Sequence, residues 1–339
     1  MKKVNVIAAI ALLCAAACND ESEAPSTANS EASFVQGELA VPDVKGEVVS
    51  AYYLGQLVEL ELVNGVYVFQ GDMQIPEDQL SFVAPPEADG PVTESVGRTG
   101  GRWANNIVYY QVASNLPNQS RVTNAIAHWE ANTSLRFVER TNQRDYIYFQ
   151  PGGGCSSFVG RIGGRQAINL ASGCSTGNTI HEIGHAIGLY HEQSRADRDD
   201  FVNVLFQNIT PGRENNFRTY VERGSDGRDY TNTLDFGSIM MYGPYSFSRN
   251  GNPTITRKDG SLYSTQRNGL SADDKTGISI MYPGTGGGGG GDQYVNGQWY
   301  TIDGLRVYRY NDLWYWYGDG RNGTQWYQVV NRNGQWFYA

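Results

Sequence analysis

Residues 181–192 read HEIGHAIGLYHE, and this stretch decides what the chain can be. His181 and His185 are four residues apart, so on a helix they project from one face, close enough to share a metal ion. Gly188 can adopt a positive φ, which would end the helix and let His191 approach the same ion from another direction. Three imidazoles with one open coordination position are typical of a catalytic zinc site rather than a closed structural one. The stretch therefore predicts one catalytic Zn²⁺ held by His181, His185 and His191.

Glu182 meets the second chemical requirement of such a site. Zinc lowers the pKa of a bound water from about 15.7 to about 7, and a nearby carboxylate can take the proton of that water as it attacks a peptide carbonyl. We therefore predict that Glu182 is the general base. A plain alternative is that Thr179 and Glu182 form only a capping box at a helix start. Three of the four histidines fall at ligand spacing, which favours the metal site, and His128 is expected in a packing or surface role.

The match to a known pattern continues beyond the third histidine. Residues 192–199 read EQSRADRD, and residues 238–242 read SIMMY. Together with residues 181–191 they resemble the HExxHxxGxxHExxRxDRD signature and the methionine turn of the astacin family of metzincin peptidases. The resemblance implies an α+β fold, namely a two-subdomain zinc peptidase with an active-site cleft that hydrolyses peptide bonds in proteins. The mixture of predicted helices and strands agrees with an α+β arrangement.

The resemblance also implies roles for individual residues. Met240 would form the turn beneath the metal, and Tyr242 would be a switchable fifth zinc ligand that stabilises the reaction intermediate. Glu192 would anchor the N-terminus created by activation. Arg267 would line a pocket for acidic residues just after the scissile bond, although a plain surface arginine is the alternative. Met241 departs from the family, whose members usually carry His there, but that side chain is not a metal ligand.

An upstream motif indicates that the enzyme is made in a latent form. Residues 69–72 read FQGD, similar to the FxGD motif in which an aspartate, here Asp72, occupies the position of the catalytic water. A carboxylate is a good zinc ligand, so the chemistry is sound, while an ordinary Gly-Asp turn is the alternative. By resemblance, activation cuts between about Ser95 and Arg102. We expect Arg98 and Arg102 to be exposed there, in a loop suited to proteolytic nicking.

The N-terminus has the features of an export signal. Lys2 and Lys3 precede an apolar stretch that is too short to span a membrane as a helix. The stretch ends at Cys18, and two interpretations stay open: ordinary cleavage after small residues, or a lipoprotein signal that makes Cys18 the lipidated first residue. The expected location is the outer membrane or cell surface in the second case, and secretion in the first. A membrane contact is predicted only through this anchor.

The cysteines fit an oxidising compartment. Cys14 and Cys18 belong to the signal, so Cys155 and Cys174 are the pair left in the mature body. Export favours a disulfide between them, which would stabilise the fold by about 3 kcal/mol. Two buried free thiols are the alternative.

Composition divides the chain into five parts. These are the signal (1–18), a tether and pro-segment (19–98), the catalytic domain (99–283), a Gly-rich linker (284–292) and an aromatic-rich β module (293–339). Within them we predict strands over Glu59–Val68, broken at Asn64-Gly65, a strand at Ile107–Val112 and a helix at Arg121–Asn132, with further strands around Leu135–Val138 and Tyr146–Phe149.

The C-terminal module holds five of the seven tryptophans and repeats Asn-Gly turns followed by aromatic pairs, as a meander of β-hairpins would. The aromatic residues either form the core of a very small domain or present a platform for a glycan, cell wall or protein.

A formal net charge of −9 without a long basic run argues against a nucleic-acid partner. Proteins or peptides are the expected substrates. The alternative function is a surface-binding lipoprotein that acts through this module.

Overall fold

The computed structural model describes residues 39–42, 44–53, 56–83, 97–98, 100–223, 227–283, 298–302, 305–310, 313–320, 323–332 and 335–338. The predicted export signal with Cys18, the tether after it and the Gly-rich linker lie outside these residues. Within the described part of the chain, no helix is long and apolar enough to cross a membrane.

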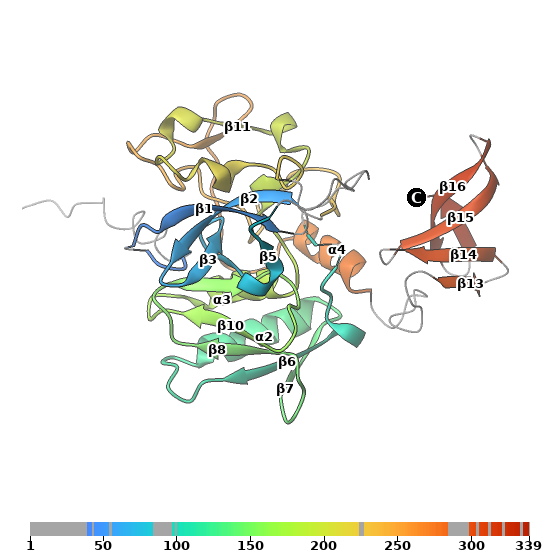
Figure 1. Ribbon diagram of the computed structural model, residues 1–339, viewed down its shortest axis with the longest axis horizontal. Helices are drawn as coiled ribbons and strands as arrows, with labels where there is room; N and C mark the ends of the chain where they lie inside the picture. Colours follow the sequence, from blue (N-terminus) through green and yellow to red (C-terminus); the bar gives the residue numbers. More distant parts are fainter. Residues whose placement is uncertain are drawn as a thin grey trace, which may run out of the picture.

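One large mixed sheet forms the centre of the fold (Figure 1). Its strands, in spatial order, are β5 (Leu80–Ser81), β1 (Glu47–Tyr53), β2 (Gln56–Val63), β3 (Val66–Phe69), β4 (Met73–Ile75), β9 (Cys155–Phe158), β10 (Arg165–Leu170), β8 (Tyr146–Gln150), β6 (Ile107–Val112) and β7 (Arg136–Glu139). The α-helices of the described residues are α2 (Ser120–Asn132), α3 (Thr176–Ala186) and α4 (Ala272–Met281). The predicted helix at Arg121–Asn132 and strand at Ile107–Val112 are confirmed.

The hairpin between β2 and β3 follows from its turn residues. Asn64 and Gly65 both have positive φ, 51° and 79°. Two such residues form the type I′ turn, whose twist matches that of the two strands it joins. The predicted break in the strand run at this dipeptide is therefore confirmed.

The main core lies between the sheet and the helices α2 and α3. Strand β10 alternates along its length, with Gln166, Ile168 and Leu170 buried on the inner face. Trp129 of α2 is fully buried, and its Nε1 donates to the carbonyl of Ile180 in α3 at 3.2 Å. This contact satisfies the polar atom of a large buried side chain, so the two helices are held together on the sheet.

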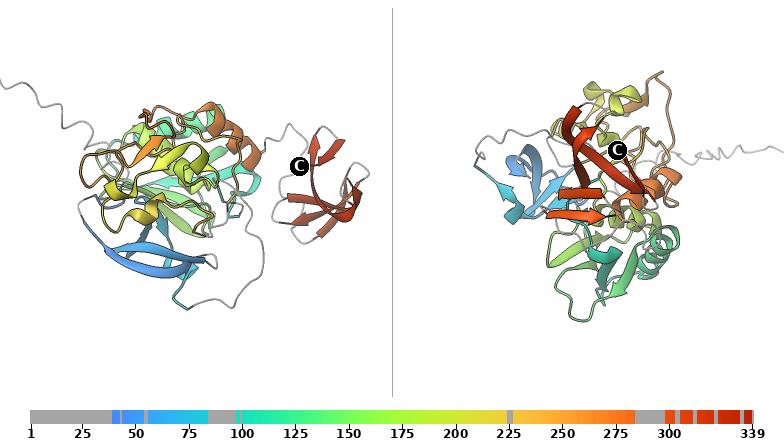
Figure 2. Two further views of the ribbon diagram at one scale, coloured as in Figure 1. Left: turned by 90° about the horizontal axis from the view of Figure 1, so that it is seen from above. Right: turned by 90° about the vertical axis from the view of Figure 1, so that its right-hand side faces the viewer.

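The N-terminal segment, residues 39–83, adds five strands to one side of this sheet. Its strand β4 pairs in parallel with β9, with Met73 opposite Ser157 and Gln74 opposite Phe158. Viewed from above, these blue strands lie along one flank of the main body (Figure 2). The segment has apolar residues for a core of its own, but the main body completes that core: Val159, Tyr190 and Tyr220 belong to the same buried cluster.

The part of the chain between α3 and α4 forms a second, less regular lobe. Its short sheet consists of β11 (Val202–Val204) and β12 (Ile255–Arg257). A separate buried cluster holds it together, with Phe217, Met241 and Tyr242 among its members. The chain therefore folds as an α+β protein with two subdomains in its main body.

The C-terminal residues form a five-stranded antiparallel meander, which confirms the predicted β-rich module. Its strands are β13 (Gln298–Ile302), β14 (Leu305–Tyr310), β15 (Leu313–Gly320), β16 (Gly323–Arg332) and β17 (Gln335–Tyr338). Val307 and Val329 are buried, whereas Trp299, Tyr317 and Trp326 are 42%, 51% and 48% exposed. Most of the predicted Asn-Gly turn residues lie outside the described residues.

Candidate metal centre

Helix α3 carries the first half of the site. Its N-cap is Ser175, whose hydroxyl accepts from the backbone N–H of Asn178 while the Asn178 side chain accepts from the Ser175 N–H. The helix start is therefore capped by this pair, and the alternative of a box between Thr179 and Glu182 is wrong; the Thr179 hydroxyl donates to the Ser175 carbonyl instead. Every residue from Gly177 to Ala186 is buried, so the helix projects its functional side chains into the interior.

Two glycines shape the path from α3 to the third histidine. Gly188 has a φ of +111°, as predicted, and the helix ends just before it. A Cβ on Gly184 would lie 2.8 Å from the sulfur of Met240. Because Gly184 has no Cβ, the segment that carries Met240 can approach the helix. His191 follows this turn and comes back beside His181 and His185.

The three imidazoles converge, and backbone carbonyls fix the tautomers of two of them. Their ring centroids are 4.7 to 5.3 Å apart. Nδ1 of His181 lies 2.8 Å from the Ile239 carbonyl, and Nδ1 of His185 lies 2.8 Å from the Leu189 carbonyl. Because a carbonyl only accepts, each Nδ1 carries the proton and leaves the Nε2 lone pair free for a metal.

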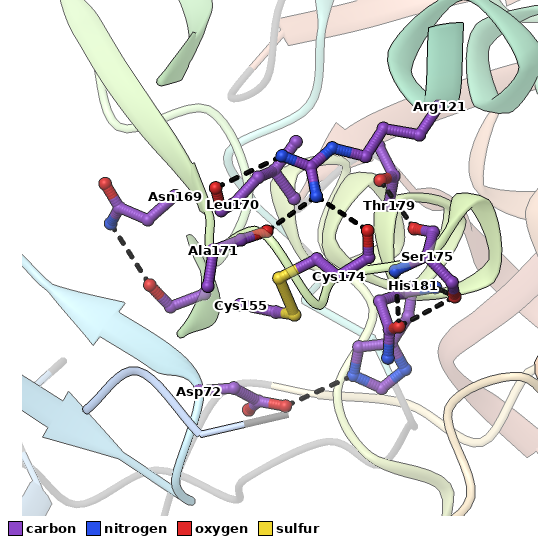
Figure 3. The surroundings of a disulfide bond; sticks show 12 residues. Asp72, Arg121, Cys155, Asn169, Leu170, Ala171, Cys174, Ser175, Thr179 and His181 are labelled. Carbon is purple, nitrogen blue, oxygen red and sulfur yellow. Dashed lines mark hydrogen bonds and ion pairs between the residues drawn. A yellow bond between two sulfur atoms is a disulfide. The ribbon is translucent and has the colours of Figure 1, made fainter. Parts of the chain in front are cut away.

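Asp72 of the N-terminal segment faces all three Nε2 atoms. Its Oδ2 lies 3.3 Å from His181 and 3.2 Å from His191, and its Oδ1 lies 3.6 Å from His185. Figure 3 shows the carboxylate directed at the ring of His181. Zinc bonds of about 2.0–2.2 Å place neighbouring tetrahedral ligands about 3.3–3.6 Å apart, so these four side chains fit one zinc ion.

The ionisation of Asp72, His185 and His191 suits metal binding. Burial lowers the pKa of His185, and it lowers the pKa of His191 to about 4, although Asp72 acts in the opposite direction. Burial alone would raise the pKa of Asp72, but His191 and His185 outweigh it and hold that pKa well below its ordinary value. At neutral pH His185 and His191 are therefore neutral and Asp72 is ionised, the forms in which imidazoles and carboxylates bind metals.

The other predicted residues of the centre lie around these ligands. Glu182 follows His181 on α3 and is fully buried. The ring of Tyr242 packs at a tilt against His191 with ring centroids 4.5 Å apart, and its hydroxyl donates to the carbonyl of Gln70 at 2.5 Å. Met240 is buried below the helix, and its carbonyl accepts from the backbone N–H of Glu192 at 3.0 Å.

Sequence comparison places the chain among known proteins. Residues 95–283 match the family model described as the astacin peptidase family. The chain belongs to the astacin family. It is 42% identical over 231 residues to blastula protease 10 of Paracentrotus lividus, covering 63% of this chain and 38% of that protein. It is also 38% identical over 194 residues to zinc metalloproteinase nas-4 of Caenorhabditis elegans, covering 55% of this chain and 61% of that protein.

A solved structure of an astacin relative has the same fold. High choriolytic enzyme 1, a hatching enzyme zinc-protease from the medaka fish Oryzias latipes, is 32% identical with a TM-score of 0.50. The match covers 54% of this chain and 93% of that one. The chain spans less than two thirds of the two sequence relatives named above.

Glu192 occupies a buried position beside a small cavity of this astacin fold. Burial raises the pKa of Glu192 to about 8, although Arg195, 3.6 Å away, acts against the shift. The carboxylate accepts from the backbone N–H of Asp235 at 2.9 Å. The cavity, of about 30 Å³, is lined by Glu192, Asp235, Asp274, Leu189, Tyr230, Thr231, Met240, Asp273 and Gly277.

Two further residues of the sequence analysis have defined places. Arg267 is half-buried and its guanidinium donates to the carbonyl of Met241 at 3.2 Å, next to Tyr242. His128 lies outside the metal centre, and its Nε2 accepts from the backbone N–H of Leu270 at 3.0 Å. The expected packing role of His128 is therefore confirmed.

The expectation that Arg98 and Arg102 are exposed is wrong. Arg98 is only 7% exposed, because its backbone N–H bonds to the Gly188 carbonyl at 2.8 Å and its guanidinium donates to the Val159 carbonyl at 3.0 Å. Arg102 is half-buried and donates to the Tyr230 hydroxyl at 2.5 Å. The composition of the surrounding residues predicts an open loop. Hydrogen-bond acceptors from distant segments of the chain instead bind both guanidiniums and hold them in the protein.

The predicted disulfide between Cys155 and Cys174 is present, and beside it lies a residue that the sequence analysis missed (Figure 3). Arg121 of α2 is 2% exposed, and its guanidinium donates to four carbonyls. These belong to Ala171 and Cys174, both at 2.6 Å, and to Pro117 and Leu170, at 3.2 and 3.3 Å. The sequence signal that could have identified Arg121 is an arginine among the apolar residues of an amphipathic helix.

Proposed function

We propose that this chain is a zinc-dependent endopeptidase made as a latent precursor in which the pro-segment aspartate blocks the metal centre. The observation that carries the proposal is the position of Asp72. Its carboxylate lies 3.2 to 3.6 Å from the Nε2 atoms of His181, His185 and His191, where a fourth zinc ligand belongs.

The catalytic roles follow from the chemistry of the residues around that position. Bound Zn²⁺ lowers the pKa of its water to about 7 and polarises the substrate carbonyl. Glu182 accepts the proton of the attacking water and delivers it to the leaving amine. The Tyr242 hydroxyl, once released from the Gln70 carbonyl, donates to the oxyanion of the intermediate, a type of contact commonly worth about 3 kcal/mol.

Latency in this proposal acts on three parts of the machinery together. Asp72 takes the place of the water, so the nucleophile is missing. Gln70 engages the hydroxyl of Tyr242 through its backbone carbonyl at 2.5 Å. Strand β4 covers β9, whose backbone groups would otherwise be available to pair with a peptide substrate. Removing the pro-segment would release all three at once.

Activation is proposed to create an N-terminus between about Ser95 and Arg102 that moves to Glu192. The small cavity beside Glu192 and the burial of its carboxylate support this role, because a buried acid gains most from a new cation.

Arg267 is proposed to select acidic residues after the scissile bond. Its bond to the carbonyl beside Tyr242 supports that position.

Export completes the proposal. The chain would leave the cell with Cys18 either lipidated or cleaved off with the signal, and the exposed aromatic face around Trp299 and Trp326 would be free to bind a glycan or a cell-surface protein. Labelling with a radioactive fatty acid, with Cys18→Ser as the control, distinguishes the two fates of the N-terminus.

The decisive test is the activity of Asp72→Ala in the full-length chain loaded with zinc. The variant should cleave casein or a mixed-peptide substrate without processing, whereas the parent precursor should not. Cleavage should disappear with a zinc chelator and in the double variant Asp72→Ala/Glu182→Ala. A single variant as silent as the parent, while the parent trimmed near Arg98 is active, would contradict the aspartate switch. Trimmed zinc-loaded protein that cleaves nothing would contradict the peptidase itself.

A further inference from the structure

Arg223 is a buried guanidinium in the second lobe that neither the metal centre nor the latency switch uses. Its side chain is 3% exposed. Its Nη1 donates to the carbonyl of Arg218 at 2.7 Å. Among the residues that the structure describes, its Nε and Nη2 atoms, both shielded from solvent, have no hydrogen-bond partner. Such groups are almost always paired in native proteins, so the two orphaned donors require an explanation.

A residue of the pro-segment covers this guanidinium. Cζ of Arg223 lies 4.7 Å from the centre of the ring of Phe69, three residues before Asp72. Phe69 is itself only 2% exposed and belongs to the buried cluster that includes Tyr190 and Tyr220. The aromatic face attracts the cation but offers no acceptor in the plane of the guanidinium. Phe69 therefore shields Arg223 from water without satisfying its N–H groups.

The charged groups that the structure describes near Arg223 do not satisfy its N–H groups either. The carboxylate of Glu222 accepts from the backbone N–H of Thr219 at 2.6 Å and pairs with Arg198 at 3.4 Å. Arg198 adds a second positive charge close by. Burial lowers the pKa of Arg223 to about 10, so the group stays charged at neutral pH. Tyr190 and Tyr242 also interact electrostatically with Arg223. Tyr190 precedes His191 in the chain, and the ring of Tyr242 packs against His191 at 4.5 Å.

We propose that Arg223 is a carboxylate-binding residue of the substrate site, covered by Phe69 in the precursor and uncovered when the pro-segment leaves. This inference rests on the proposed latency, because only release of the pro-segment exposes the guanidinium. Nε and Nη2 lie on one edge of a guanidinium and match the two oxygens of a carboxylate. The ligand is therefore the side chain of an Asp or Glu in the substrate, or the C-terminal carboxylate of a peptide.

The first test needs no catalysis. Phenylglyoxal, which modifies accessible guanidiniums, is applied to the zinc-loaded full-length chain and to the same protein after limited trypsin treatment, both carrying Glu182→Gln. Mass spectrometry should find Arg223 unmodified in the precursor and modified after removal of the pro-segment. Phe69→Ala should make it reactive in the precursor, whereas Phe82→Ala, a change at an exposed position, should not. Equal reactivity before and after processing would overturn the covering by Phe69.

Peptide ligands then identify the carboxylate. A peptide with an internal Glu and an amidated C-terminus, its Gln counterpart, and the Gln peptide with a free C-terminal acid are each added to the processed Glu182→Gln protein. Protection of Arg223 by the first peptide points to a side chain, and protection by the third points to a terminal carboxylate. Equal reactivity with all three peptides would overturn the proposal.

The second test measures specificity in processed enzyme with Glu182 intact. In Arg223→Gln, kcat/KM for the favoured carboxylate peptide should fall roughly tenfold or more, while kcat/KM for the neutral peptide stays within about twofold. Arg223→Lys should retain part of the preference, and Arg267→Gln should alter the preference at a different peptide position. An unchanged acidic-to-neutral ratio in Arg223→Gln would overturn the inference. Absence of cleavage by the parent enzyme would contradict the proposed function, and the labelling result would still decide the role of Arg223.

Discussion

Each of the three histidines proposed to bind zinc is positioned by a backbone feature close to it in sequence. His181 and His185 share a face of α3 because they are one helical turn apart. His191 reaches the same point because Gly188 takes a φ of +111°, which residues with a Cβ rarely adopt. The geometry of the centre therefore depends on one residue that has no side chain.

Gly188→Ala should weaken the metal centre. A Cβ would meet nothing closer than 3.4 Å, so the penalty comes from the backbone conformation and should be about 1–2 kcal/mol of unfolding free energy. Because the strain falls between two ligands, zinc affinity should drop about tenfold or more. Gly163→Ala is the matched control, since Gly163 also has a positive φ, of 87°, and open space. Equal zinc affinities in the two variants would contradict this explanation.

His128 should make stability depend on pH. Burial and Lys275 lower its folded-state pKa below the unfolded value of about 6.5, and its Nε2 must be unprotonated to accept from Leu270. The unfolded chain therefore takes up the proton first, and stability should fall as the pH drops below about 6.5 through the folded pKa.

Denaturant unfolding of the parent and of His128→Gln between pH 7.5 and about 5 checks this prediction. The zinc-site histidines are common to both proteins, so the difference between the two curves reports His128. We expect the parent to lose more stability than the variant as the pH falls. Parallel curves would show that His128 does not contribute.

Among the structural elements, the connection from β10 to α3 is held by both a disulfide and a buried arginine. The disulfide joins β9 to the residue before the helix cap, and Arg121 of α2 binds carbonyls on both sides of this loop (Figure 3). Buried backbone carbonyls need hydrogen-bond donors, and in this loop the guanidinium of Arg121 supplies them. Because α3 carries two of the proposed metal ligands, the start of that helix must be held in place for the site to form.

Arg121→Leu should therefore destabilise the protein strongly. It would leave four carbonyls without their charged donor in a buried site, at a cost of about 3 kcal/mol, measured by denaturant unfolding. Arg136→Leu is the matched control: Arg136 also donates to three carbonyls, but it is exposed, so water can replace it. Its cost should stay within about 0.5 kcal/mol. Similar losses in both variants would contradict the role of burial.

At the scale of the whole molecule, the N-terminal segment and the main body share a sheet and a core. The segment extends the sheet through β4 and β9, and Arg213 of the second lobe pairs with Glu61 of β2. The apolar residues at the contact are buried only when the N-terminal segment and the main body are together. Cutting the chain between them should therefore not separate them at once.

We expect that a precursor cut at a protease site engineered within residues 84–96 keeps its pro-segment bound until it is diluted. Phe69→Ala should weaken this association by about 3–5 kcal/mol, because Phe69 is a large, fully buried side chain. Phe82→Ala should change it little, since Phe82 is 56% exposed. Native mass spectrometry at several concentrations measures the dissociation constant. Equal dissociation constants for the two variants would contradict the prediction that the two parts share a core.

Several features of this protein follow from local spacing in the sequence. The helical repeat brings His181 and His185 together, a glycine allows the turn after them, and Asn64-Gly65 closes a hairpin, because each of these follows from backbone conformation over a few residues. Which distant groups come into contact, in contrast, depends on the packing of the whole chain. Asp72 lies 109 residues before His181, Arg98 is buried although its surroundings read as an open loop, and Arg223 lies beneath Phe69. Burial and charge pairing are set by long-range packing, which local sequence patterns do not encode.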